Sequence, residues 1–548
     1  MFCNQCEQTA KGGCTTIGVC GKKHEVAALQ DLLTYAVRGL CHLTISGRSV
    51  EIIDAEINRF SMKAIFSTLT NVNFDPTCLE ALIRETVEKR EILNNKIMNA
   101  GSTVLFDDPA TTFQPAKDIA GLVKQGEKIG LPIDLEREQD VKNLQETTLY
   151  GIRGAAAYAD HAAVLGQEDD EIYSSLQDKL SKLTDKSLSL QDWAKLAIDT
   201  GKTNLRAMEL LDAGNTTHFG HPQPSLVSRG HKAGKAILVT GHDLKDLEDL
   251  LKQTEGKEIN IYTHGEMLPC HAYPELKKHS HLVGHYGTAW QNQQKEFPDF
   301  PGAILFTTNC IQEPESSYKD NVFTTGLVAW PGTTHVENGD FCQVIDKALQ
   351  MPGFTDEKHN DSVWVGYGRN TVLQDHPMGR VIDTLVDYVK SKQIRHFFLV
   401  AGCDGAKPGR NYYTDFVEKA PEDTVILTLA CGKFRFFDRD LGAIDGVPRL
   451  IDVGQCNDAY SAIIIATALA EALEMEINDL PLSLILSWYE QKAVAIILSL
   501  FYYGFKNIRL GPTMPAFLTP SVLNVLVDDN TLLPISTPEK DIADCLSS

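Results

Sequence analysis

Four cysteines near the amino terminus have a spacing suited to a single metal centre. The spacing is C-x2-C-x7-C-x5-C, formed by Cys3, Cys6, Cys14 and Cys20. Four thiolates this close together can surround one small centre, and the glycines among them let backbone N–H groups approach the sulfur atoms. The pattern favours an iron–sulfur cluster, with structural zinc as the alternative, because spacing alone does not separate the two.

Seven further residues with metal-binding side chains each follow a short apolar run that is typical of a β-strand. They are His242, Glu266, Cys310, Cys403, Cys431, Cys456 and Glu490. Strands that alternate with helical segments indicate parallel sheets, whose sites lie beyond the carboxyl ends of the strands. Thiolate, imidazole and carboxylate together suit iron with mixed sulfur and oxygen bridging better than zinc or magnesium. The alternative is seven unrelated loop residues.

A lysine follows the last of these carboxylates. Lys492 lies two residues after Glu490 in an otherwise apolar segment. A lysine is rarely buried without a partner or a purpose. The side chain therefore either pairs with Glu490 or another carboxylate for stability, or supplies a proton beside a metal-bound substrate.

The residues from His24 to about Asn215 show helical periodicity and an internal repeat. One helix face is marked by Leu29, Leu32, Leu33, Ala36, Val37 and Leu40. The residues Leu29-Gln30-Asp31, Tyr35 and Val37-Arg38-Gly39 recur at the same mutual spacing as Leu144-Gln145-Glu146, Tyr150 and Ile152-Arg153-Gly154. We infer a duplicated helical bundle whose second unit spans about 118–215.

Two breaks divide the chain. The run 218–224 contains Pro222 and Pro224, which end the helical pattern, and a second break is expected near 374–377. We therefore expect a helical domain over 1–219 that carries the amino-terminal centre. Two similar Rossmann-like α/β domains with parallel sheets should follow over 220–375 and 376–548. If their strand ends face each other, the seven residues meet between these two α/β domains.

Charge and cysteine content exclude several classes of function. A formal net charge of −22 argues against nucleic acid or an anionic membrane surface as partner. The most apolar stretch, 480–505, is interrupted by Glu490 and Lys492, so no transmembrane helix is predicted. Thirteen cysteines, four of them within the first twenty residues, leave no room for a secretory signal peptide and indicate the reducing cytoplasm.

Three further features of the sequence are weaker evidence for a functional site. The histidines between His264 and His285 are interpreted as surface and pocket-lining side chains rather than a metal tract. The turn at Gly366 and Gly368 lacks the third glycine of a dinucleotide loop. The remaining cysteines are interpreted as small buried side chains or stay unassigned: Cys41, Cys78, Cys270, Cys342 and Cys545.

The candidate residues lie in short motifs along the whole chain. The motifs are MFCNQCEQTA at 1–10, GHDL at 241–244, HGEMLP at 264–269, TNC at 308–310, AGCDG at 401–405, ACG at 430–432, GQCND at 454–458 and WYEQKA at 488–493. As an ordered set, they resemble the hybrid cluster protein family, also called prismane proteins or hydroxylamine reductases. The family fold is a helical domain followed by two similar α/β domains, in agreement with the expected boundaries.

The resemblance implies two iron–sulfur centres. The four amino-terminal cysteines match those that hold a cubane [4Fe-4S] cluster, since their short spacing is similar to the cubane subgroup rather than the [2Fe-2S] subgroup. A hybrid [4Fe-2O-2S] cluster is bound in the family by residues that match the seven strand-end positions. The cysteine matching Cys403 can be a persulfide there, and the lysine matching Lys492 lies at the cluster.

The resemblance also implies an activity, the reduction of hydroxylamine by two electrons and two protons to ammonia and water. An external electron-donor protein would supply electrons through the cubane, and protons would come from Lys492, Glu266, Glu490 or His242. Three alternatives remain. They are reduction of nitric oxide to nitrous oxide, a sensing or S-nitrosylating role in which Cys403 exchanges sulfur or a nitrosyl group with partner proteins, and electron storage without catalysis.

Overall fold

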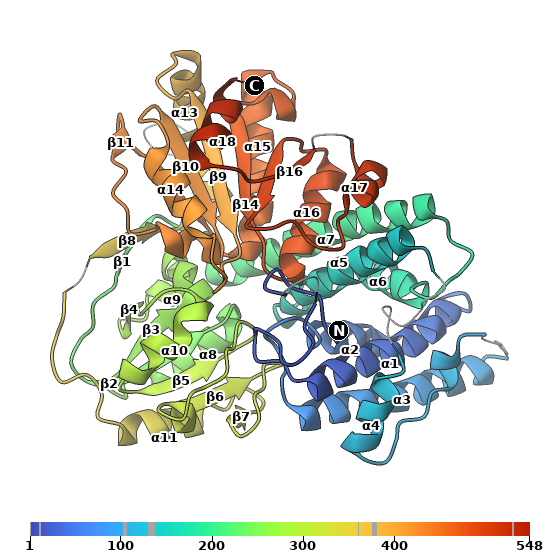
Figure 1. The fold of residues 1–548 in the computed structure, drawn as a ribbon. Helices are drawn as coiled ribbons and strands as arrows, with labels where there is room; N and C mark the ends of the chain where they lie inside the picture. Colours follow the sequence, from blue (N-terminus) through green and yellow to red (C-terminus); the bar gives the residue numbers. More distant parts are fainter. Residues whose placement is uncertain are drawn as a thin grey trace.

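The computed structural model describes residues 2–9, 13–101, 107–129, 137–359, 361–374, 381–528 and 531–547. A helical region comes first, and two α/β regions follow in separate lobes (Figure 1). The expected multidomain α and α/β fold with parallel sheets is therefore confirmed. The second expected break, near 374–377, lies outside the described residues from 375 on. Among those described, no helix combines the length and the apolar character needed to cross a membrane.

Long helices with buried apolar stripes build the first region. They are α1 (His24–Arg48), α2 (Ala55–Phe66), α3 (Pro76–Asn99), α4 (Ile119–Gly126), α5 (Gln139–Val164), α6 (Asp170–Ser181) and α7 (Leu190–Phe219). The two copies of the repeat lie in α1 and α5, and their leucines are fully buried. Helix α7 begins at a capping box between Ser189 and Asp192 and ends where Gly220 adopts φ 80°.

The first sheet is parallel, with strand order β4-β3-β2-β5-β6-β7. Its strands are β2 (Lys235–Thr240), β3 (Ile259–His264), β4 (Leu282–His285), β5 (Ala303–Phe306), β6 (Val322–Thr325) and β7 (Thr334–Val336). The accompanying helices include α8 (Leu244–Thr254), α9 (Pro274–Lys277), α10 (Gln293–Glu296) and α11 (Cys342–Gln350). In order along the chain this is the Rossmann order 3-2-1-4-5-6.

The second sheet repeats this topology as β13-β10-β9-β14-β15-β16, again all parallel. Its strands are β9 (His396–Gly402), β10 (Thr424–Leu429), β13 (Leu450–Gly454), β14 (Leu482–Ser487), β15 (Ile508–Gly511) and β16 (Leu532–Pro534). Its helices are α13 (Val381–Lys390), α14 (Asn411–Lys419), α15 (Ala459–Leu473), α16 (Gln491–Tyr503), α17 (Pro520–Leu526) and α18 (Pro538–Ser547). The two sheets are thus similar both in strand order and in being entirely parallel.

Shorter elements connect these regions. The strands β1 (Ser225–Ser228) and β8 (Ser362–Val365) form an antiparallel ribbon, and β11 (Ala443–Ile444) pairs with β12 (Val447–Pro448). Helix α12 (Arg369–Leu373) follows the glycine-containing turn at 366–368. This turn follows β8, which belongs to the antiparallel ribbon and not to either parallel sheet. It is therefore not a dinucleotide-binding loop of the Rossmann kind.

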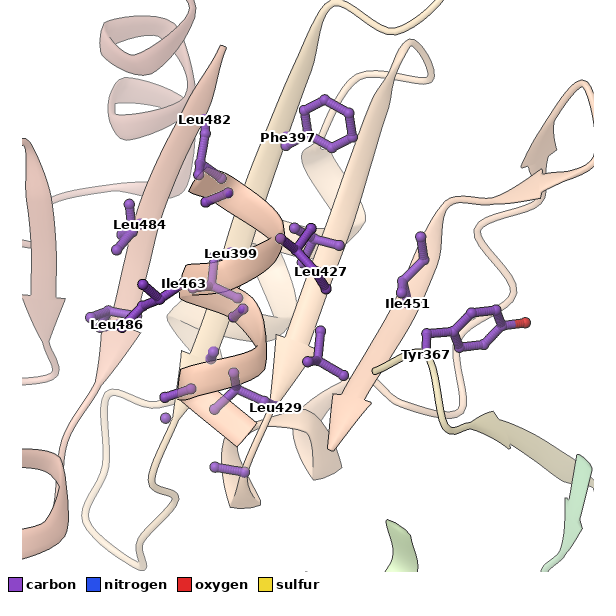
Figure 2. A pocket seen from close by; sticks show the side chains of 18 of the residues that line it. Tyr367, Phe397, Leu399, Leu427, Leu429, Ile451, Ile463, Leu482, Leu484 and Leu486 are labelled. Atoms are coloured by element: carbon purple, nitrogen blue, oxygen red, sulfur yellow. The ribbon is translucent and has the colours of Figure 1, made fainter. Parts of the chain in front are cut away.

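One face of the second sheet borders an apolar cavity of about 880 Å³. Figure 2 shows Leu399, Leu427 and Leu484 projecting from the strands toward the helix that carries Ile463. The cavity runs along the strands and reaches their carboxyl ends at Cys403. The side chains that line it are mostly aliphatic, so the space favours apolar molecules over water.

Helix α16 packs against the helical region at very short range. A Cβ atom on Gly201 of α7 would lie 2.1 Å from the backbone oxygen of Leu498, and one on Gly154 of α5 would lie 2.6 Å from that of Gln491. Glycine is required at these positions because backbone meets backbone. The contact places the start of α16 beside the amino-terminal loop.

We expect Gly201→Ala to destabilise the protein, because the new methyl group meets a backbone carbonyl that cannot rotate away. Overpacking of this kind costs about 1–3 kcal/mol, and calorimetry should show a lower midpoint of thermal unfolding. Gly368→Ala is the matched control, since its Cβ would meet its nearest neighbours at 3.7 Å, an ordinary contact. Equal midpoints for the two variants would contradict the close packing.

Candidate metal centres

The four amino-terminal cysteines lie together on a loop. Cys14 donates its backbone N–H to the carbonyl oxygen of Cys3 at 2.7 Å, which brings the two ends of the loop side by side. Cys6, Cys14 and Cys20 are buried, and none of the four forms a disulfide. Burial raises the pKa of Cys6, and the neighbouring charges of Cys20 and Cys3 raise it further. Thiolates so close together repel one another unless a metal neutralises them.

The second copy of the helical repeat holds this loop. The side-chain amide of Asn4 donates to Glu146 Oε2 at 3.0 Å and to Oε1 at 3.2 Å. Tyr150 donates its hydroxyl to Asn4 Oδ1 at 2.7 Å, and the guanidinium of Arg153 donates to the side-chain oxygen of Gln5. The second copy of the repeat therefore fixes the amino-terminal loop in place, which is the structural role expected of the helical domain.

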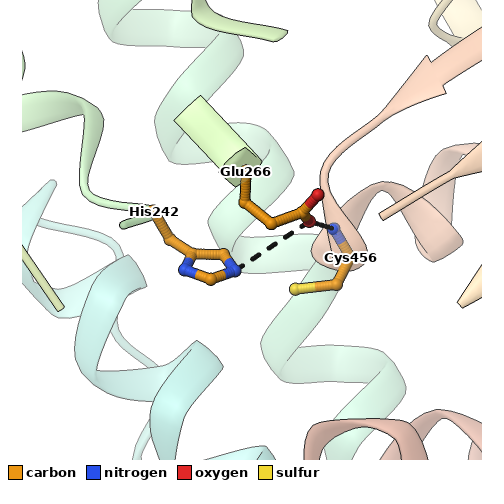
Figure 3. Close-up of side chains that lie close together, drawn as sticks. All are labelled: His242, Glu266 and Cys456. Atoms are coloured by element: carbon orange, nitrogen blue, oxygen red, sulfur yellow. Dashed lines mark hydrogen bonds and ion pairs between the residues drawn. The ribbon is translucent and has the colours of Figure 1, made fainter. Parts of the chain in front are cut away.

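Three strand-end residues form the core of a second site (Figure 3). Ligand atoms of His242, Glu266 and Cys456 all lie within 4.8 Å of one another, and all three residues are buried. The Nε2 atom of His242 lies 3.9 Å from Glu266 Oε2, which also accepts the backbone N–H of Cys456 at 3.0 Å. The first two residues follow strands of one sheet and the third follows a strand of the other.

The other four strand-end residues lie around this core. The thiol of Cys310 contacts the thiol of Cys431. This contact and burial both raise the pKa of Cys431. Burial also raises the pKa of Cys403, and the charges of Glu490 and Cys456 add to the shift. The structure therefore brings all seven residues within electrostatic reach at the carboxyl edges of both sheets. Two non-glycine residues here have left-handed backbone, Cys310 at φ 70° and Ala430 at φ 62°, a strain that often marks a site.

Lys492 lies inside this group and is buried. Its ammonium lies 3.2 Å from His242 Nε2 and donates to Asn309 Oδ1 at 3.2 Å. Glu490 instead accepts the backbone N–H of Lys492, at 3.0 Å. Burial alone would lower the pKa of Lys492, but the charges of Cys456, Glu490 and the other thiols outweigh it and raise that pKa. The side chain is a protonated cation aimed at the site.

The imidazole of His242 is neutral in these surroundings. Burial lowers its pKa well below the usual value, and the Lys492 ammonium lowers it further. A neutral imidazole can bind a metal through its free nitrogen. The second carboxylate oxygen of Glu266, Oε1, is buried and accepts no hydrogen bond from any described group. Glu266 Oε1 is thus an open donor atom, whereas His242 Nε2 is contacted by the Lys492 ammonium.

Sequence reasoning missed the residues that hold the site together. The amide of Gln455 donates to the backbone oxygen of Glu266 at 2.7 Å and to that of His242 at 3.3 Å, and so joins the two sheets. The buried ammonium of Lys433 lies 2.5 Å from Asp452 Oδ1. The only signal for Gln455 in the sequence is its place beside Cys456.

The interpretation of the histidine-rich segment as surface and pocket-lining side chains is wrong for His264, His271 and His285, which are buried. The buried imidazoles of His271 and His285 hydrogen-bond to Thr263, and that of His264 bonds to Thr240. Within the described part of the chain, the compact group of potential metal ligands is His242, Glu266 and Cys456, which includes none of these histidines. They belong to the packing of the first sheet.

Fold and donor set together define a cysteine-rich metalloprotein with two Rossmann-like lobes. Residues 1–543 match the Prismane/CO dehydrogenase family, and the chain belongs to that family. A hydroxylamine reductase of Syntrophobacter fumaroxidans is 61% identical over 99% of both chains. One of Methanocella arvoryzae is 59% identical over 99% of both.

Solved structures show the same fold at low identity. Carbon monoxide dehydrogenase IV of Carboxydothermus hydrogenoformans superposes with a TM-score of 0.55 at 15% identity, over 100% of this chain and 92% of that one. The enzyme of Thermococcus sp. AM4 gives 0.54 at 16% identity, over 99% and 90%. These likenesses concern the fold alone.

We expect Cys310→Ala to lose about half of the bound iron, because one of two centres loses a ligand. Cys342→Ala is the matched control: this thiol is exposed and lies outside both groups. Iron and acid-labile sulfide per chain, measured on anaerobically purified protein, check the expectation. An equal iron content in the two variants would remove Cys310 from the ligand set.

Proposed function

We propose that this chain is a hydroxylamine reductase that reduces NH2OH with two electrons and two protons to ammonia and water. The observation that carries the proposal is the mixed donor set of His242, Glu266 and Cys456 with the Lys492 ammonium beside it. Relatives named hydroxylamine reductase, 50–61% identical over essentially the full length, support it.

Cofactors follow from the chemistry of the donor groups. We assign a [4Fe-4S] cluster to Cys3, Cys6, Cys14 and Cys20, whose all-thiolate set suits iron and sulfide. The hybrid [4Fe-2O-2S] cluster is assigned to His242, Glu266, Cys310, Cys403, Cys431, Cys456 and Glu490. The open Oε1 atom of Glu266 and the neutral imidazole of His242 fit such a mixed centre. When bound, the clusters supply electrons and a Lewis-acidic iron position.

The chain's own residues provide the protons. Lys492 holds an ammonium proton in a buried site, so it can donate to the oxygen that leaves as water. Asn309 fixes the ammonium through its side-chain oxygen. Glu266, Glu490 and His242 are the remaining proton-carrying candidates at the site, and burial raises the pKa of Glu266 to about 6.

The surroundings of the reaction are also part of the proposal. An electron-donor protein delivers electrons to the amino-terminal cluster. All thirteen cysteines lie outside disulfides, which supports a reducing cytoplasmic location.

We further propose that 1–219, 220–375 and 376–548 are the three domains, with the hybrid cluster between the latter two. The end of α7 at Phe219 and the shared strand order support this division.

Nitric oxide reduction is a second candidate, favoured by the apolar cavity beside the second sheet. The cavity reaches Cys403, Cys456 and Lys492 at its inner end, and its walls are aliphatic along the strands. An uncharged diatomic molecule partitions into such a space, whereas hydroxylamine loses hydrogen bonds to water there.

We expect Lys492→Met to lower hydroxylamine turnover by about 10²-fold or more, because loss of a positioned acid removes a contribution of that size. Turnover should be driven by reduced methyl viologen, measured as ammonia released, and normalised to iron content. Lys506→Met, at an exposed lysine, is the control. Unchanged turnover at equal iron content would remove Lys492 from the mechanism.

Parallel assays decide between the two substrates. The proposal expects a larger kcat/KM for hydroxylamine than for nitric oxide in anaerobic assays at low substrate concentration. Leu427→Trp, which fills part of the cavity, should lower nitric oxide turnover more than hydroxylamine turnover. A larger kcat/KM for nitric oxide would make it the substrate of the site.

A further inference from the structure

A second cavity, of about 360 Å³, lies beside the amino-terminal cysteine loop and reaches Cys3. Equivalent residues from both copies of the helical repeat line it: Gln30 and Gln145, Asp31 and Glu146, Tyr35 and Tyr150, Arg38 and Arg153. Two helices from separate halves of the repeat thus present the same polar side chains to one space. The proposed reaction does not use any of them.

The two acids of the repeat have different surroundings. Glu146 is 8% exposed, and both its oxygens accept hydrogen bonds from the Asn4 amide. Asp31 is half-buried at the cavity and makes no hydrogen bond to a described side chain. Only Glu146 is therefore connected to the loop that carries the cysteines, through a residue adjacent to Cys3.

Charged and titratable groups face Glu146 from each element around it. In the cavity that Glu146 lines, Asp31 and Arg38 come from α1, Arg153 and Tyr150 from α5, Cys3 and Lys22 from the amino-terminal segment, and Lys128 and Arg137 from the segment between α4 and α5. Burial raises the pKa of Glu146 to about 7, the charge of Asp31 adds to the rise, and Asn4 and Arg153 oppose it. Burial raises the pKa of Asp31 to about 6, opposed by Arg153 and Lys22. Burial and the neighbouring acid thus make the Glu146 carboxyl hold its proton more tightly than an exposed glutamate does.

We propose that Glu146 takes up a proton when the amino-terminal cluster gains an electron and releases it when that electron leaves. The inference rests on the proposed function only in requiring a redox-active cluster on these cysteines. An added negative charge in a poorly solvated region raises the proton affinity of a nearby carboxylate. One electron from the donor protein is then balanced by one proton from solvent, which enters through the cavity and binds the Glu146 carboxylate.

The sign of the expected pH dependence follows from this balance. Below the pKa that Glu146 has beside the oxidised cluster, the carboxyl group is protonated in both states and the potential is constant. Between that pKa and the higher one beside the reduced cluster, reduction consumes a proton and the midpoint potential falls as pH rises. The limit is 59 mV per pH unit for one proton and one electron, since this is a tenfold change in the equilibrium constant.

A redox titration of the full-length protein tests the proposal. The paramagnetic signal of the reduced amino-terminal cluster is followed between pH 6 and 9 in wild type, Glu146→Gln, Asp31→Asn and Tyr150→Phe. We expect a falling potential in wild type and in the last two variants, and a constant potential in Glu146→Gln. Tyr150→Phe loosens Asn4 without removing an acid, so it separates a structural effect from a proton effect.

Each outcome has a defined meaning. A potential in wild type that does not change with pH overturns the proposal without any variant, and so does an unchanged slope in Glu146→Gln. If only Asp31→Asn lost the pH dependence of the midpoint potential, the proposal would also be overturned, because Asp31 rather than Glu146 would then be the proton acceptor. Iron content and viologen-driven hydroxylamine turnover report separately on the proposed function, which can fail while the coupling stands.

Discussion

The burial of charged and polar groups where the two sheets meet is the constraint on which the rest of the structure depends. Lys492, Glu490, His242 and Glu266 are all removed from water there. An ionised group in such a place is stable only if opposite charges and hydrogen bonds replace its hydration. Because the partners come from both sheets and from α16, separation of these parts would leave several uncompensated charges at once. Fold and site are therefore stabilised by the same contacts.

Helix α16 extends this constraint to the amino-terminal loop. Gln491, its first residue, donates to the carbonyl oxygen of Gln5 at 3.0 Å and accepts the backbone N–H of Thr70 at 3.0 Å. The backbone N–H of Glu7 donates to the carbonyl oxygen of Tyr489 at 2.9 Å. Residues next to the cysteine loop are thus bound to the same segment that carries Glu490 and Lys492. A displacement of α16 would disturb both groups of cysteines together.

Differences between similar units explain much of the chemistry. The two sheets share one strand order, yet the first provides His242, Glu266 and a single thiol, whereas the second provides three thiols and Glu490. Together the two sheets supply a donor set of mixed hardness, with most of the thiolates on the second. The two copies of the helical repeat differ as well, since Glu146 holds the cysteine loop and Asp31 does not.

The sequence by itself predicted the helices of the repeat and the seven strands that precede the expected strand-end ligands. An apolar run followed by a donor residue is a local pattern, and parallel strands bring such patterns to one edge, so no long-range information was needed. Only the tertiary structure decided how these edges face each other. The contacts of Lys492 with His242 and of Gln455 with Glu266 join residues 250 and 189 positions apart. Such contacts depend on how separate lobes pack, and neither periodicity nor spacing encodes that packing.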